Sequence, residues 1–69
     1  MTLSDLRIQN SLTQQELAKR TGINYETYRR YEYGRQFPRP KAICSLAKLY
    51  SISPGELFES LCREKGLIP

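Results

Sequence analysis

Apolar residues recur along this chain at intervals of three and four positions, which is the spacing of one face of an α-helix. One such set lies in the middle of the chain and consists of Ile43, Leu46, Ala47 and Tyr50. Its i, i+3, i+4, i+7 spacing marks an amphipathic helix. No segment alternates apolar and polar residues over a useful length, as a half-buried strand would. The pattern therefore predicts an all-α chain.

Capping signals divide the chain into five short helices. Residues 2–5 (TLSD) resemble a capping box, and residues 13–16 (TQQE) form a complete one. In a capping box the side chains at the two ends each accept a hydrogen bond from the other residue's backbone amide. Ser11 interrupts the first helix, and Gly22 suits the left-handed position that ends the second.

The next two helices have equally clear limits. Asn24 is a good N-cap for a helix from Tyr25 to Tyr33, which Gly34 ends. The segment RQFPRP, residues 35–40, contains two prolines and is predicted to be a loop. Its last proline occupies a first-turn position of the fourth helix.

The fifth helix begins with a capping box at residues 53–56. Its predicted inner face consists of Leu57, Phe58, Leu61 and Cys62. A chain of 69 residues allows one domain, which we expect to span 1–69 with its core in 2–62 and a frayed tail in 63–69. With 39% apolar residues and no tryptophan the core is small, so well-capped helices or a partner subunit are needed for stability.

The cysteines and the missing histidine limit the chemistry. Cys44 and Cys62 form no CxxC motif, and the chain has no histidine, so we expect no metal and no cofactor. A disulfide is conceivable, but both cysteines lie among apolar residues at helical spacing, which predicts two buried free thiols in a reducing cytosol. No apolar run approaches the roughly 18 residues of a membrane span, and no signal peptide opens the chain. We therefore expect a cytoplasmic protein that does not contact a membrane.

The net charge of +4, from 11 Lys and Arg against 7 Asp and Glu, fits a polyanion such as nucleic acid, although many inert basic domains share it. The helix at 25–33 divides into two faces. Tyr28 and Tyr31 lie with Glu32 on the inner side. The outer side has two arginines, a glutamate and aromatic rings, so it can donate, accept and make apolar contacts with base edges in a major groove. An ordinary solvated face would have the same composition.

The second and third helices, separated by residues 20–24, form a helix-turn-helix with a glycine in the turn and the small Ala18 where the helices cross. The stretch Leu3 to Phe58, about four fifths of the chain, resembles the helix-turn-helix domain of the Cro and phage-repressor type, the XRE family. The motifs that carry the resemblance are LSDLR, SLTQQELAKRTGIN, RRYEYG and KAICSLAKLYSISPGELF. It implies a compact lambda-repressor-like bundle of five helices.

The resemblance further implies a transcriptional regulator, expected to be a repressor, that binds double-stranded DNA as a homodimer on a near-palindromic site with its third helix in the major groove. The positions that match the family's base-facing residues are Tyr25, Glu26 and Arg30. Those that match residues turned toward base or phosphate are Gln14, Asn24, Thr27 and Arg29, and the phosphate-binding ones are Arg35, Arg39 and Lys41. The resemblance also implies an ion pair between Arg7 and Glu32, which would tie the first helix to the third.

Two residues depart from the family pattern. Tyr28 stands where a β-branched residue or leucine is usual, which requires a roomier interior or a hydroxyl that reaches the rim. Glu26 is a base-facing anion that repels phosphate unless it accepts from a cytosine amino group or braces Arg30.

Catalysis and protein interaction are the alternatives to DNA binding. Without histidine, a Ser/Lys or Cys/His pairing, or the size for a deep cleft, the chain is not expected to be an enzyme. The main alternative is a protein-interaction module, such as an antitoxin or an anti-repressor partner, which would use an apolar patch formed by Leu57, Phe58, Leu61 and Leu67. DNA binding is favoured because the grouping it needs is complete: Gln14, Arg30, Arg39 and Lys41.

Overall fold

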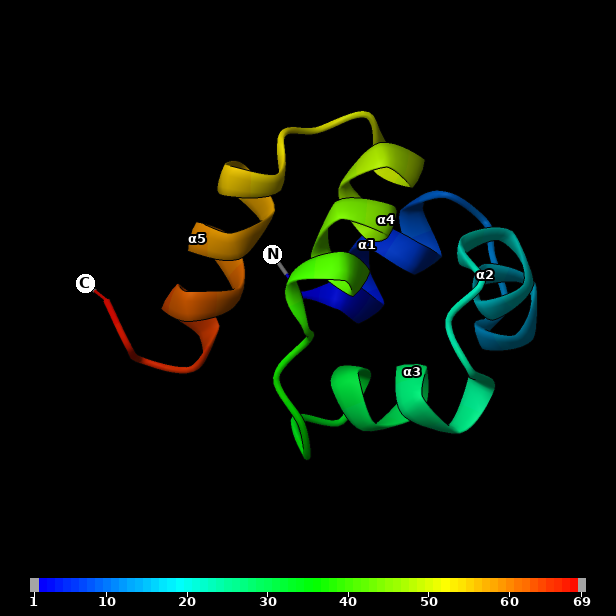
Figure 1. Cartoon of the computed structure of the whole chain (residues 1–69), viewed down its shortest axis with the longest axis horizontal. Helices are drawn as coiled ribbons and strands as arrows, with labels where there is room; N and C mark the ends of the chain where they lie inside the picture. The colour runs from blue at the N-terminus through cyan, green and yellow to red at the C-terminus, as the bar shows by residue number, and fades with distance from the viewer. Residues whose placement is uncertain (1, 69) are drawn as a thin grey trace.

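The computed structural model describes residues 2–68, which fold into five α-helices and contain no strand. In chain order these are α1 (Leu3–Gln9), α2 (Gln14–Thr21), α3 (Tyr25–Glu32), α4 (Pro40–Tyr50) and α5 (Pro54–Glu64). Figure 1 shows α3 along one edge of the molecule and α5 at the far side from α2. The prediction of an all-α bundle of five short helices is confirmed.

Local hydrogen bonds explain where the first two helices begin. Thr2 pairs with Asp5, and Thr13 with Glu16, in complete capping boxes. Hydrogen bonds from the backbone of Thr2 and Thr13 lower the pKa of both acidic partners. At the other end of α2 the backbone of Gly22 adopts the left-handed conformation, with φ of 75°. The predicted starts of both helices and the predicted end of α2 are therefore formed by the predicted residues, whereas α1 ends at Gln9 with Asn10 as its C-cap, shortly before Ser11.

The later helices differ slightly from expectation at their ends. α3 ends at Glu32, and Tyr33 is its C-cap, one residue earlier than predicted. In α5 the Ser53 hydroxyl accepts from the amide of Glu56, and the helix continues to Glu64. The first two residues of the expected tail, 63 and 64, are thus helical.

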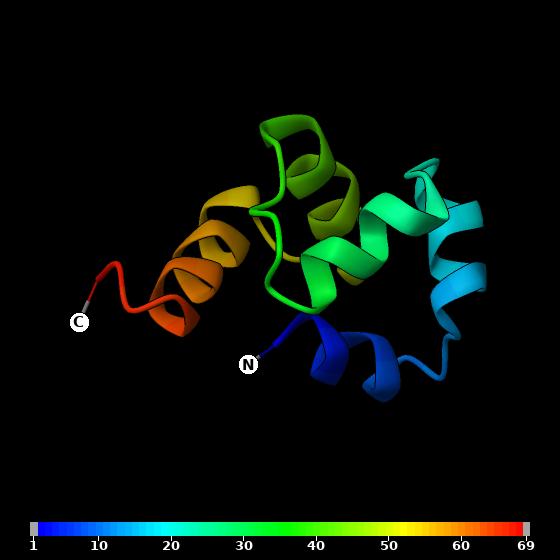
Figure 2. The same ribbon diagram turned by 90° about the horizontal axis from the view of Figure 1, so that it is seen from below.

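The core lies between the helices and is built mainly from leucines and two tyrosines. Its largest fully buried side chains are Leu17, Tyr28, Leu46 and Leu57. Packing joins α2 to α3 and α4, α4 to α5, and α1 to α3. Because Tyr28 and Tyr31 fill this core, the opposite face of α3 is left outside it; the view from below presents this helix at the front of the molecule (Figure 2).

Two predicted core positions are wrong. Phe58 is 48% exposed, and Cys44 is also exposed. Each follows a buried residue by one position, and a helix turns through about 100° per residue, so each points away from the contact that its neighbour makes. Phe58 instead packs edge-on against Phe37, with ring centroids 5.9 Å apart. Cys62 is buried as predicted, and both thiols are free.

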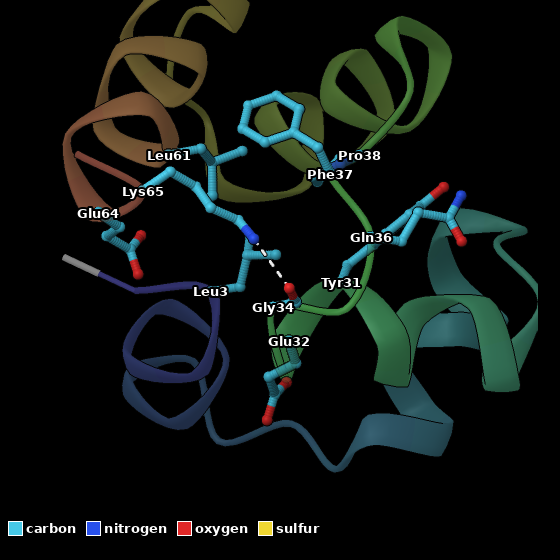
Figure 3. A pocket seen from close by; sticks show the side chains of 10 residues that line it. All are labelled: Leu3, Tyr31, Glu32, Gly34, Gln36, Phe37, Pro38, Leu61, Glu64 and Lys65. Carbon is cyan, nitrogen blue, oxygen red and sulfur yellow. Dashed lines mark hydrogen bonds between the residues drawn. The ribbon is translucent and has the colours of Figure 1, made fainter. Parts of the chain in front are cut away.

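The end of α5 contacts the end of α3 across a cavity of about 260 Å³. Lys65 Nζ donates to the carbonyl oxygen of Gly34 at 2.8 Å, as Figure 3 shows. Leu3 of α1 also lines this cavity. Burial raises the pKa of the nearby Glu64 carboxyl. The contact restrains the loop that leads from α3 to α4.

Candidate nucleic-acid interface

The turn between α2 and α3 is held by short-range hydrogen bonds. The Thr21 hydroxyl donates to the carbonyl of Leu17 at 2.8 Å, and the Ile23 amide donates to Thr21 Oγ1 at 3.4 Å. The Asn24 side chain then accepts from the amide of Thr27 and starts α3. Ala18 is buried, so its small side chain allows the close approach of the two helices that a helix-turn-helix requires.

A largely buried ion pair, whose members keep some exposure to solvent, fixes α3 against α1. Arg7 Nε and Nη2 donate to the two carboxylate oxygens of Glu32, both at 2.9 Å, and Arg7 Nη1 donates to the carbonyl of Leu12. The side chains are 16% and 5% exposed. Such paired, charge-assisted bonds are strong and directional. Burial would raise the pKa of Glu32, but the hydrogen bonds from Arg7 and Gln14 hold it below its ordinary value.

Gln14 connects α2 to this ion pair. It is the first residue of α2, and its Nε2 donates to Glu32 Oε1 at 3.2 Å and to the Tyr33 hydroxyl at 3.3 Å. These two hydrogen bonds therefore orient the Gln14 side chain before it makes the base or phosphate contact that is expected of it. Tyr33 was not among the site residues predicted from the sequence, because its contact with Gln14 depends on how α2 and α3 pack.

The unusual tyrosine at position 28 is accommodated in the interior and does not reach the rim. Its side chain is fully buried; its hydroxyl faces the Glu32 carboxylate without a hydrogen bond of standard geometry, and within residues 2–68 the buried hydroxyl of Tyr50 has no hydrogen-bond partner. Burial raises the pKa of Tyr28, and the adjacent Glu32 carboxylate raises it further. Burial likewise raises the pKa of Tyr50 to about 12. Both phenols therefore remain neutral beside the ion pair.

The outer face of α3 contains two arginines: Arg29 contacts neighbouring side chains, whereas Arg30 is exposed. Arg29 Nη1 lies 3.1 Å from Glu26 Oε1, and its guanidinium carbon lies 5.6 Å from the ring centroids of both Tyr25 and Tyr33. Glu26 therefore braces Arg29, whereas the sequence indicates Arg30 as the residue that it could brace. The i, i+3 spacing makes this contact. Arg30 is exposed.

Two surface depressions border α3, and the remaining predicted DNA-contact residues line them. One, of about 320 Å³, is lined by Glu26, Arg29, Arg30, Tyr33 and Arg35. The other, of about 250 Å³, has Asn24 and Thr27 on one side and Arg39 and Lys41 of the α4 N-terminus on the other. Arg30, Arg35, Arg39 and Lys41 are all exposed. The structure thus brings basic side chains to both ends of one helix face.

Only part of the predicted apolar patch lies on the surface. Leu57 and Leu61 are buried in the chain's own core, 1% and 7% exposed, because they pack α5 against α4. Phe58 and Leu67 remain available, at 48% and 66% exposed. An apolar depression of about 430 Å³ adjoins Phe58, between the start of α4 and the start of α5.

None of the helices within residues 2–68 is long and apolar enough to cross a membrane. In the same part of the chain, no three His, Cys, Asp or Glu residues are grouped as a metal would require.

Comparisons with known proteins agree with this geometry. Residues 3–57 match the family described as Helix-turn-helix, and the chain belongs to that family. A similar protein is the "Cryptic phage CTXphi transcriptional repressor RstR" of Vibrio cholerae, which is 38% identical over 55 residues. That match covers 80% of this chain and 50% of the relative, so the chain spans about half the length of this curated protein. No solved structure matches significantly. The Cro and phage-repressor resemblance is thereby confirmed.

Proposed function

We propose that this chain binds double-stranded DNA sequence-specifically and acts as a transcriptional regulator, with repression as its effect. The observation that carries the proposal is the outer face of α3, which has Tyr25, Glu26 and Arg30 along it and basic residues beside both of its ends. An exposed helix of this composition, rigidly packed on its other face, fits a major groove. The name of the phage relative supports the repressor role.

Phosphate contacts belong to the residues that frame α3. Arg39 is the N-cap of α4 and has no side-chain capping bond, so its guanidinium is available beside the free amides of the helix start. Those amides and the helix dipole favour an anion. Lys41 lies in the same turn, and Arg35 borders the other depression. Asn24 and Thr27 line the same depression as Arg39 and Lys41, and Gln14 contacts Tyr33. These three residues are proposed to contact base or phosphate.

Selection of bound duplexes from a random DNA pool tests the proposal. We expect one enriched motif, with two copies in inverted orientation. Arg30→Ala with Arg39→Ala should abolish enrichment, whereas Arg63→Ala, which removes a charge from the exposed surface of α5, should leave the motif unchanged. A wild-type chain that enriches no motif would refute sequence-specific binding.

A protein-interaction role is the second candidate, and it is favoured by Phe58, which is exposed and lines the apolar depression, while Leu67 is exposed beyond the other end of α5. The two roles are compatible. Phe58→Asp should leave the DNA motif unchanged if this surface serves a protein partner alone. Loss of the inverted second half-site in this variant would instead link the surface to dimerisation.

A further inference from the structure

Three side chains along the outer face of α3 form a continuous stack. Tyr25, Arg29 and Tyr33 are four residues apart, the spacing that brings side chains together on a helix. The Arg29 guanidinium lies between the two rings, 5.6 Å from each centroid. Glu26 contacts its edge at 3.1 Å. The cation is thus held on both faces and along one edge.

This arrangement already engages the Arg29 guanidinium. Its Nη1 donates to Glu26 Oε1 at 3.1 Å, and its side chain is 38% exposed. To contact a phosphate, Arg29 would have to leave both rings and Glu26. A planar guanidinium is well suited to stacking between rings, and each exposed contact of this kind is weakly favourable. Arg30, one position further, is exposed.

The stack is anchored to the core at its Tyr33 end. Gln14 Nε2 donates to the Tyr33 hydroxyl and also to Glu32, which pairs with Arg7. Contacts therefore run without a break from the buried ion pair through Tyr33 and Arg29 to Tyr25. The free end of the series is Tyr25, the residue expected to meet a base.

We propose that Arg29 is a positioning residue, which holds the Tyr25 ring in the orientation that contacts a base and does not itself neutralise a phosphate. The inference rests on the proposed DNA-binding function and replaces the base or phosphate contact expected for Arg29 from the family resemblance. Ordering Tyr25 before binding removes part of the entropy cost of ordering it on DNA.

Binding at several salt concentrations separates positioning from phosphate contact. The test compares Arg29→Lys and Arg29→Ala on the selected operator duplex and on a random duplex. Both variants should bind the operator about tenfold more weakly, as expected from losing two stacking contacts, with an unchanged salt slope and a relaxed base preference. Arg39→Ala is the control, and its slope should fall by about 0.9. If Arg29→Lys binds like the wild type and Arg29→Ala lowers the slope, Arg29 is a phosphate contact and the proposal is wrong.

A second measurement needs no DNA. Three-bond NMR couplings of Tyr25 should report a single χ1 rotamer in the wild type and averaged rotamers in both Arg29 variants. A single Tyr25 rotamer in all three proteins would overturn the positioning role. If the wild-type chain itself selects no operator, the proposed function fails, and the base contact of Tyr25 fails with it. That outcome differs from an Arg29-specific failure, in which the wild type binds and only the variants contradict the proposal.

Discussion

Arg29 and Arg30 are neighbours on α3 with the same charge, but their surroundings differ. Arg29 is enclosed by two rings and a carboxylate, whereas Arg30 is exposed. An exposed guanidinium on the outer face has the donors in the fork arrangement that suits a guanine edge. We therefore propose that Arg30, and not Arg29, is the arginine of this helix that reads a base, alongside Tyr25.

Arg30→Ala should cost about 1–3 kcal/mol on the operator and little on random DNA, with relaxed preference at one base pair. Lys41→Ala should instead weaken binding to both DNAs alike and lower the salt slope by about one counterion, because a phosphate contact is independent of sequence. Fluorescence anisotropy at two salt concentrations measures both effects. An equal loss on operator and random DNA for Arg30→Ala would reduce Arg30 to a phosphate contact.

The Arg7–Glu32 pair should contribute to stability in a non-additive way. Removing either partner leaves a buried charge uncompensated, which costs about 3 kcal/mol. Replacing both, for example by Arg7→Met with Glu32→Gln, should cost less than the sum of the single changes. Urea titrations of the four proteins measure this coupling, and additive losses would show that the contact has no energetic effect.

The same pair should make stability depend on acid pH. The folded-state pKa of Glu32 is lowered, so the stabilisation is complete above the unfolded-state pKa, near 4.5, and is lost as the pH falls through the folded value. Glu32→Gln should therefore show a shallower loss of unfolding free energy between about pH 5 and pH 3. Chemical denaturation across this range measures the slope. A slope identical to that of the wild type would mean that Glu32 is not preferentially ionised in the folded state.

The stability of an individual helix depends on the backbone conformation at a few positions, and substitutions at two glycines test this dependence. Gly22 ends α2 with φ of 75°, and a Cβ there would meet no atom within 4 Å. Gly22→Ala should thus lose about 1 kcal/mol through backbone strain alone. Gly55, in the first turn of α5, has an ordinary helical backbone, and a Cβ there would only approach Ser53 Oγ at 3.9 Å.

Gly55→Ala is therefore the matched control, and it should raise stability by about 0.5 kcal/mol, because alanine reduces the freedom of the unfolded chain. Thermal unfolding followed by circular dichroism compares the two variants. Opposite signs are expected, and a stabilised Gly22→Ala would contradict the left-handed cap.

The size of the molecule limits the number of base pairs that one chain can contact. The chain measures 32 × 24 × 21 Å, and α3, the one helix proposed to enter the major groove, would cover only a few base pairs. Two copies bound one helical turn apart, roughly 34 Å, would be close neighbours on the same side of the duplex. A two-fold dimer would double the sequence that is read, and so provide the discrimination that a genome demands.

Footprinting and sedimentation on the selected operator should accordingly show two chains and a symmetric footprint. Duplexes with one half-site should bind more weakly, and inserting five base pairs between half-sites should remove cooperativity by rotating one copy to the opposite face. A single chain on an asymmetric site at saturation would contradict the dimer.

Local chemistry accounts for the parts of the structure that could be predicted from sequence. The capping boxes at Thr2 and Thr13 and the glycine at 22 act within a few residues of themselves, so their effects do not depend on the rest of the fold. Helical periodicity similarly identified Tyr28 and Tyr31 as core. The Tyr25–Arg29–Tyr33 spacing was also readable, but periodicity alone could not tell a stack from three separate exposed side chains.

Tertiary packing settled the features that join distant residues. Glu32 lies 25 positions from Arg7 and 18 from Gln14, and their convergence requires α1, α2 and α3 to be assembled. Packing also exposed Cys44 and Phe58, because α4 and α5 contact each other along a narrower stripe than their apolar residues suggest. Short-range hydrogen bonds and side-chain periodicity thus specified the helices, since their energies are set locally. The surface proposed to face DNA depends on contacts between helices, whose geometry arises when the core closes.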